Sequence, residues 1–166
     1  WRMRRLSKEG RYGCYRRSRR AAGAAAVTLF NRSYQVDIDL NREQLIGGEV
    51  FSHEGDFTET LRFTGVIRGC VPNVGISAST GVYTWAELTK VLLAGADTAQ
   101  MCTAVYKQGA TAIAEALKGL RHWMLEHGYQ SLSELRGRLS YGAVADPSLF
   151  ERIQFMKYFN ARAAQD

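Results

Sequence analysis

Apolar residues occur along this chain in short runs and at helical spacing, and the signals for strands and helices are most closely spaced between residues 74 and 109. Residues 74–77 form a short apolar and small-residue run that is typical of a buried parallel strand. Thr84 and Glu87 then have the spacing of a capping box, which opens a helix, and Gly95 is placed to end it. Three apolar residues share one face of this predicted helix: Leu88, Val91 and Leu92.

A second strand is predicted over residues 98–102, ending at Thr103. A strand, a helix and another strand make a βαβ unit, which builds a parallel sheet whose ligands collect beyond the carboxyl ends of the strands. Each predicted strand runs into small or hydroxyl-bearing residues: Ser79, Thr80 and Gly81 after the first, Cys102 and Thr103 at the second. Two such loops on one edge could hold a phosphate with backbone N–H groups, hydroxyls and the start of a helix.

An earlier strand is predicted at residues 27–30, and it ends at Asn31. The Asn31 amide would then face the same edge as the two loops; the alternative is that it only starts a turn. Residues 34–56 alternate charge, glycine and short apolar pairs, which indicates an irregular or hairpin-like excursion with an edge strand at residues 36–40. A helix is predicted over residues 59–68.

In the carboxyl-terminal part of the chain, apolar residues recur at helical spacing. A long helix is predicted over residues 110–127, and a short one begins at Ser131 and ends at Gly137. Asp146 followed by a proline predicts the N-cap of a last helix. The predicted apolar stripe of the long helix consists of Ile113, Leu117, Leu120 and Met124.

Composition indicates one globular domain, since 46% of the 166 residues are hydrophobic and 23% are charged. No apolar run approaches the length that spans a membrane and no secretory signal is present, so we expect a cytoplasmic protein without membrane contact. Three cysteines without a C-x-x-C pair predict neither a disulfide framework nor a zinc site. His122 and His127 are expected on the surface, and Asp37 and Asp39 on a solvent face, so no metal site is predicted.

The net charge of +6 comes from residues 1–20, which hold eight Arg and one Lys against one Glu. The remaining residues therefore carry a net charge of −2. Such a basic arm could bind nucleic acid or an acidic partner. We expect it instead to be disordered or not native to the fold, and nucleic acid is not an expected partner.

Three separated stretches in the same order resemble the FMN-dependent dihydroorotate dehydrogenase family, in particular its dihydroorotate dehydrogenase-like branch. The first is residues 29–39 (LFNRSYQVDID), the second contains SASTGV at 77–82 and LLAGAD at 92–97, and the third is the tail from 151 to 159. The resemblance covers roughly residues 20–160. It implies an α/β fold, namely strands 6 to 8 of a (β/α)8 barrel with their covering helices, so that residues 21–166 are a carboxyl-terminal part of an FMN-binding barrel.

The resemblance also implies a function. It assigns FMN as cofactor, with its phosphate held by Ser79, Thr80, Gly81, Cys102 and Thr103, and it assigns Asn31 to the pyrimidine substrate. The activity implied is the oxidation of dihydroorotate to orotate in pyrimidine biosynthesis. The family's catalytic base and its lysine near the flavin ring lie amino-terminal to anything matched here, so no catalytic residue is assigned and this chain alone is expected to be inactive.

Two alternatives remain open from the residues themselves. The chain could be a non-catalytic binding fragment that uses the arginine-rich arm. Three parallel strands cannot close a barrel, so the open sheet edges could also pair with another copy of the chain.

Overall fold

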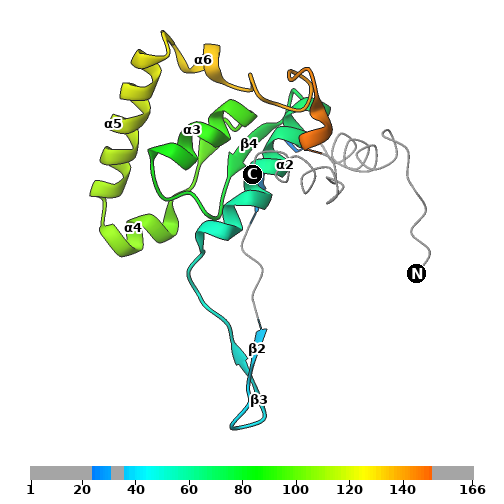
Figure 1. The fold of residues 1–166 in the computed structure, drawn as a ribbon, viewed down its shortest axis with the longest axis vertical. Coiled ribbons are helices and arrows are strands. Elements are labelled where there is room, and N and C mark those ends of the chain that lie inside the picture. Colours follow the sequence, from blue (N-terminus) through cyan, green and yellow to red (C-terminus); the bar gives the residue numbers. More distant parts are fainter. Residues whose placement is uncertain (1–23, 31–35, 151–166) are drawn as a thin grey trace, which may run out of the picture.

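A computed structural model describes residues 24–30 and 36–150 of the chain (Figure 1). Three strands, β1 (Ala26–Leu29), β4 (Gly75–Ala78) and β5 (Thr98–Ala99), form a sheet in the order β1-β4-β5 with every neighbouring pair parallel. The predicted α/β fold with a parallel sheet is therefore confirmed. The second predicted strand is wrong in its length, because β5 ends at Ala99 rather than continuing to Cys102.

Two helices cover one face of this sheet. α2 (Phe57–Cys70) packs against β1, β4 and α3 (Trp85–Ala94). The strand residues on this face are buried in register, since Val27 lies beside Ile76 and Leu29 beside Ala78. On the opposite face Ala26 and Thr28 are exposed, so the described residues leave that face of β1 uncovered.

The start and the end of α3 follow the sequence prediction. The Thr84 side chain accepts a hydrogen bond from the Ala86 backbone N–H, and the Thr84 backbone N–H donates to the Glu87 carboxylate at 2.9 Å. Gly95 ends the helix with a φ of 120°, a conformation that favours glycine. Leu88, Val91 and Leu92 are buried, so the predicted apolar face of the helix is confirmed.

The later helices are α4 (Cys102–Gln108), α5 (Thr111–Glu126), α6 (Leu132–Leu135) and the short 3-10 turn η2 (Pro147–Leu149). The predicted long helix is confirmed as α5. The helix predicted from Ser131 ends at Leu135, two residues before Gly137. Asp146 caps η2 by accepting a hydrogen bond from the Ser148 backbone N–H at 3.0 Å. The rest of the predicted last helix lies outside the described residues.

The apolar stripe predicted for α5 is only partly right, because Leu120 is buried and Met124 packs against the core, but the first two positions of the stripe do not face inward. Ile113 and Leu117 are 46% and 56% exposed, whereas the buried positions are Ala112, Ala116 and Leu120. α5 lies against α3 (Figure 1), and a Cβ added at Gly119 would lie 2.3 Å from the Trp85 ring. Because the helices approach closely near Gly119, the small residues Ala112 and Ala116 are buried while Ile113 and Leu117 turn outward.

The excursion between β1 and α2 contains a hairpin. β2 (Val36–Asp39) and β3 (Gln44–Gly47) pair antiparallel, and the turn η1 (Glu54–Asp56) leads into α2. The hairpin extends away from the helices and the parallel sheet (Figure 1). The predicted hairpin-like excursion with an edge strand is therefore confirmed.

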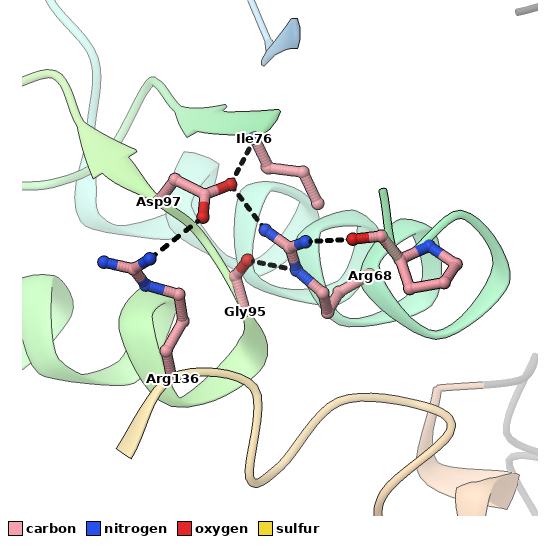
Figure 2. A network of polar contacts seen from close by, with 6 residues as sticks. Arg68, Ile76, Gly95, Asp97 and Arg136 are labelled. Atoms are coloured by element: carbon pink, nitrogen blue, oxygen red, sulfur yellow. Dashed lines mark hydrogen bonds and ion pairs between the residues drawn. The ribbon is translucent and has the colours of Figure 1, made fainter. Parts of the chain in front are cut away.

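Asp97 joins four segments of the chain at the amino end of the sheet (Figure 2). One carboxylate oxygen accepts hydrogen bonds from the Ile76 backbone N–H at 2.8 Å and from Arg68 at 2.5 Å, and the other accepts from Arg136 at 3.2 Å. Arg68 also donates to the carbonyls of Gly95 and Pro72, both at 2.7 Å. One carboxylate thus ties the start of β4 to α2, to the end of α3 and to the segment after α6.

No helix of the described residues is long and apolar enough to cross a membrane. Within the ranges 24–30 and 36–150, no group of His, Cys, Asp and Glu side chains is arranged to hold a metal ion. The arginine-rich arm, Asn31 and the matched tail from residue 151 lie outside the described residues.

Replacing Asp97 tests the importance of this junction. Asp97→Asn is expected to lower the free energy of unfolding by about 2 kcal/mol, because the two guanidinium groups lose a charged acceptor. Urea unfolding followed by circular dichroism measures the change. The control is Glu126→Gln, which removes the exposed ion pair with His122 and should change stability by less than about 0.5 kcal/mol. Equal effects of the two substitutions would contradict this account of the junction.

Candidate functional site

The loop after β4 and the start of α4 line one cavity. This cavity has a volume of about 200 Å³ and lies beyond the carboxyl ends of β4 and β5. The structure thus brings together all five residues predicted to hold a phosphate: Ser79, Thr80, Gly81, Cys102 and Thr103. Val50, Ser52, Val82 and Gln100 complete the lining.

The loop after β4 is held by hydrogen bonds from two sides. Thr60, which is buried in α2, donates to the carbonyls of Ser79 and Thr80 at 2.8 and 3.0 Å. The Thr80 hydroxyl donates to the Phe30 carbonyl at 2.8 Å. A hydroxyl has one proton to donate, so the Thr80 side chain is committed to the loop and can offer a ligand only acceptor positions.

Gly81 is required by its protein surroundings. Its φ is +79°, and a Cβ there would lie 2.6 Å from the backbone of Phe57, the first residue of α2. A glycine in such a loop can let the backbone approach a ligand, but this one also has a structural role. The structure shows that the missing side chain makes room for α2.

Three hydroxyl groups form a chain along the other wall of the cavity. The Ser52 hydroxyl lies 3.0 Å from both the Thr103 hydroxyl and the Tyr83 hydroxyl. Tyr83 also donates to the Ser52 carbonyl. Because the Tyr83 proton goes to the Ser52 carbonyl, Ser52 must donate to the Tyr83 oxygen and Thr103 must donate to the Ser52 oxygen for the chain to be complete, so the Thr103 hydroxyl offers a ligand only acceptor positions. Ser52 and Tyr83 were missed by the sequence analysis, because only the tertiary fold brings them beside Thr103.

Ser79 differs from the other hydroxyl residues of the site. It is only 8% exposed and lines the cavity, yet its side-chain hydroxyl has no hydrogen-bond partner within the described part of the chain. Its backbone N–H and carbonyl are both used in pairing with the end of β1. A buried hydroxyl without a partner is costly, and it is satisfied when a ligand or water accepts its proton.

Cys102 and Thr103 occupy the first turn of a helix and not the end of a strand, which corrects the sequence prediction. Met101 at the N-cap position gives no side-chain hydrogen bond to this turn. Cys102 is an exposed free thiol that lines the cavity. Gln100, just before it, donates from its side chain to the Ser77 hydroxyl at 3.1 Å and so stands across the end of β4.

Glu87 supports the loop by holding the start of α3. Partial burial would raise the pKa of its carboxyl, but hydrogen bonds from the Thr84 hydroxyl and the Thr84 backbone outweigh burial, so the pKa lies below its usual value. Glu87 is therefore ionised at neutral pH and remains the acceptor that closes the capping box.

Asn31, predicted to contact a substrate, lies outside the described residues. The residue before it, Phe30, is hydrogen-bonded to the loop after β4 through its N–H and its carbonyl. The chain therefore leaves β1 beside the cavity.

Two larger hollows lie elsewhere. One of about 590 Å³ lies between α3 and α5, and one of about 620 Å³ lies between α2, α3 and residues 139–150. Both are formed mainly by helices. Ligands of parallel α/β sheets bind at the carboxyl ends of strands, so position favours the smaller cavity over size.

Sequence comparison finds curated relatives of one kind. The catalytic subunit of dihydroorotate dehydrogenase B (NAD(+)) from Pyrococcus abyssi is 30% identical over 121 residues, which is 70% of this chain and 40% of that protein. The putative dihydroorotate dehydrogenase A (fumarate) of Streptococcus pyogenes is 36% identical over 70 residues, 42% of this chain and 22% of that protein. The resemblance to the dihydroorotate dehydrogenase family is confirmed. No family model matches the chain.

Solved structures agree on the fold. The dihydroorotate dehydrogenase of Eimeria tenella in complex with ferulenol superposes with a TM-score of 0.63 at 18% identity, over 80% of this chain and 35% of that one. Its ligand-free form gives a TM-score of 0.61. The chain spans 40% or less of the length of the curated dihydroorotate dehydrogenases that it matches.

Replacing Gly81 tests how the loop is built. Gly81→Ala is expected to destabilise the fold by about 3 kcal/mol or more, because the new Cβ meets the α2 backbone and also requires an unfavourable φ. Gly128→Ala is the matched control, since Gly128 has a φ of +74° with nothing within 4 Å of an added Cβ; a cost of about 1 kcal/mol is expected there. Urea unfolding of both variants measures the difference. Equal costs would show that contact with Phe57 does not constrain the loop.

Proposed function

We propose that this chain is the FMN-phosphate-binding part of a dihydroorotate dehydrogenase-like oxidoreductase. The three parallel strands would be strands 6 to 8 of the barrel, and the cavity between the loop after β4 and the start of α4 would hold the terminal phosphate of FMN. The relationship to dihydroorotate dehydrogenases and the position of the cavity at the strand ends support this assignment.

The unsatisfied Ser79 hydroxyl is the observation that carries the proposal. It is buried, it lines the cavity, and it has no partner among the described residues. A phosphate oxygen would accept its proton, and hydrogen bonds to a charged group are stronger than those to a neutral one. Thr103, in the first turn of α4, could add its backbone N–H from the opposite wall.

The cavity suits a phosphate group and not a whole flavin. Its volume of about 200 Å³ is below the range of about 300–1,000 Å³ that is typical of small-molecule pockets. No Lys or Arg lines it, so the phosphate would be held by hydroxyls and backbone N–H groups. The rest of the cofactor would have to lie outside this cavity.

In the activity implied by the relatives, this phosphate site would only position the cofactor. Oxidation of a dihydroorotate-like substrate to an orotate-like product releases a hydride, which the flavin would accept, and a proton, which a general base would accept. Within the chain, Ser79 and Thr103 would fix the cofactor's phosphate, and Thr60 and Thr80 would hold the loop in place. No described residue is assigned as the general base.

Flavin titration of the purified chain tests the proposal. FMN is expected to bind more tightly than riboflavin, which lacks the phosphate, with flavin fluorescence as the readout. Ser79→Ala should weaken FMN binding about tenfold or more, because a hydrogen bond to a charged phosphate is lost, and should leave riboflavin binding unchanged.

Thr80→Val is the matched comparison. Its hydroxyl donates to Phe30 and cannot donate to a phosphate, so this variant should lower stability but leave the FMN-to-riboflavin ratio close to that of the unaltered chain. Equal binding of FMN and riboflavin by the unaltered chain, or a larger loss of FMN binding in Thr80→Val than in Ser79→Ala, would refute the phosphate assignment.

A further inference from the structure

The larger of the two hollows between helices is a groove bounded by α2, α3 and residues 139–150, with a volume of about 620 Å³. We call it the α2–α3 groove. It shares no described lining residue with the cavity at the strand ends. Volumes of about 300–1,000 Å³ are typical of sites that hold a small molecule. Its size and its separate lining make it a candidate for a second, independent binding site.

Each helix contributes one stripe of side chains to the groove. Residues three and four positions apart lie on the same side of a helix, and both stripes have this spacing. The lining residues are Thr58, Leu61 and Arg62 from α2, and Lys90, Leu93 and Ala94 from α3. Each stripe therefore combines apolar surface with one cation.

The third wall of the groove is held in place by contacts with both helices. The Leu139 backbone N–H donates to the Leu93 carbonyl at 2.9 Å, and the Tyr141 backbone N–H donates to the Gly65 carbonyl at 3.0 Å. Farther along, the Phe150 ring packs so closely on Gly65 that an added Cβ would clash with it. The described residues therefore form the groove without any ligand.

Aliphatic side chains of the groove are open to solvent. Leu139 and Leu149 are 51% and 60% exposed, and Leu61, Leu93 and Val144 are half-buried. Apolar side chains that gather in one concave surface are stabilised when an apolar group displaces water from them. The walls therefore favour a ligand with an extended apolar part.

The two cations of the groove favour an anion. Arg62 is half-buried, and its Nε donates to the Phe150 carbonyl at 2.8 Å, which fixes the guanidinium in place. Within residues 24–30 and 36–150, no Asp or Glu lines the groove or forms an ion pair with Arg62 or Lys90. Glu87 interacts electrostatically with Lys90, but its carboxylate is held by Thr84 at the start of α3.

We propose that the α2–α3 groove binds a fatty carboxylate. The alkyl chain would lie against the aliphatic walls, and the carboxylate would pair with Arg62 and Lys90. A neutral apolar molecule would leave both cations without an anion, and a small inorganic anion would leave the leucines exposed. A fatty carboxylate satisfies both parts of the groove.

Isothermal titration calorimetry of the full 166-residue chain tests the proposal with decanoate, 1-decanol and decyltrimethylammonium. Decanoate should bind with a Kd below about 1 mM and about tenfold more tightly than 1-decanol, because only decanoate has an ionised head group that pairs with the cations. Decyltrimethylammonium should bind more weakly than either. Octanoate should bind about tenfold more weakly than decanoate, because it buries two methylene groups fewer.

Substitutions in the groove locate the binding site. Arg62→Gln and Lys90→Gln should each reduce the preference for decanoate over 1-decanol about fivefold. Leu149→Asp places a carboxylate at an exposed position of the wall and should weaken decanoate binding at least tenfold. The control is Arg121→Gln, which removes an exposed cation of α5 outside the groove and should leave decanoate binding unchanged. Circular dichroism shows whether each variant is folded.

Equal binding of decanoate and 1-decanol overturns the proposal, because the head group would then not be recognised. Absence of decanoate binding up to about 1 mM overturns it as well. Decanoate binding that is unchanged in folded Lys90→Gln and Leu149→Asp, or that FMN displaces, would place the ligand elsewhere and also overturns it. FMN binding is measured separately, so failure here leaves the phosphate assignment standing.

Discussion

The central position of β4, between two parallel neighbours, is the constraint on which the rest of the structure depends. β1 pairs with β4 along its whole length and β5 pairs with its last two residues, so all three strands point the same way. Their carboxyl ends therefore meet at one edge. That alignment places the loop after β4 beside the start of α4, although the two are separated by a complete helix in the sequence.

The two ends of this sheet have different polar chemistry. At the amino end, the Asp97 carboxylate accepts hydrogen bonds from two guanidinium groups and a backbone N–H. At the carboxyl end, the loop backbone is held by Thr60 and Thr80 while the Ser79 hydroxyl stays unsatisfied within the described residues. This contrast fits the general rule that ligands of parallel α/β sheets bind beyond the carboxyl ends of the strands.

The similarity to dihydroorotate dehydrogenases bears on why some surfaces of the described residues are uncovered. The curated relatives of that kind are longer than the present chain, and the matched region covers 40% or less of their length. The described residues contain a helix-covered sheet in which one face of β1 is exposed, and a cavity of about 200 Å³ at the carboxyl edge of the sheet. They also contain a hairpin whose apolar face has no partner among them. Both the bare sheet face and the hairpin are surfaces that further protein or ligand would cover.

Much of the local structure could be predicted from the sequence because it depends on neighbours in the chain. The capping box of Thr84 and Glu87, the stop at Gly95 and the hairpin each involve residues only a few positions apart, and all three are confirmed. The five phosphate-loop candidates could also be chosen from the sequence, since parallel strands have their carboxyl ends together. Their presence in one cavity follows from that rule.

What only the tertiary structure decided depends on contacts between distant segments. The side of α5 that faces inward is set by the close approach of α3 at Gly119, which the helical period alone does not reveal. The role of Gly81 is set by the backbone of α2, and the proton of Thr80 is committed to Phe30. Ser52, in the segment between β3 and η1, reaches the site through its contact with Thr103. Local periodicity determines which elements form, but packing between elements determines which side chains remain free to bind.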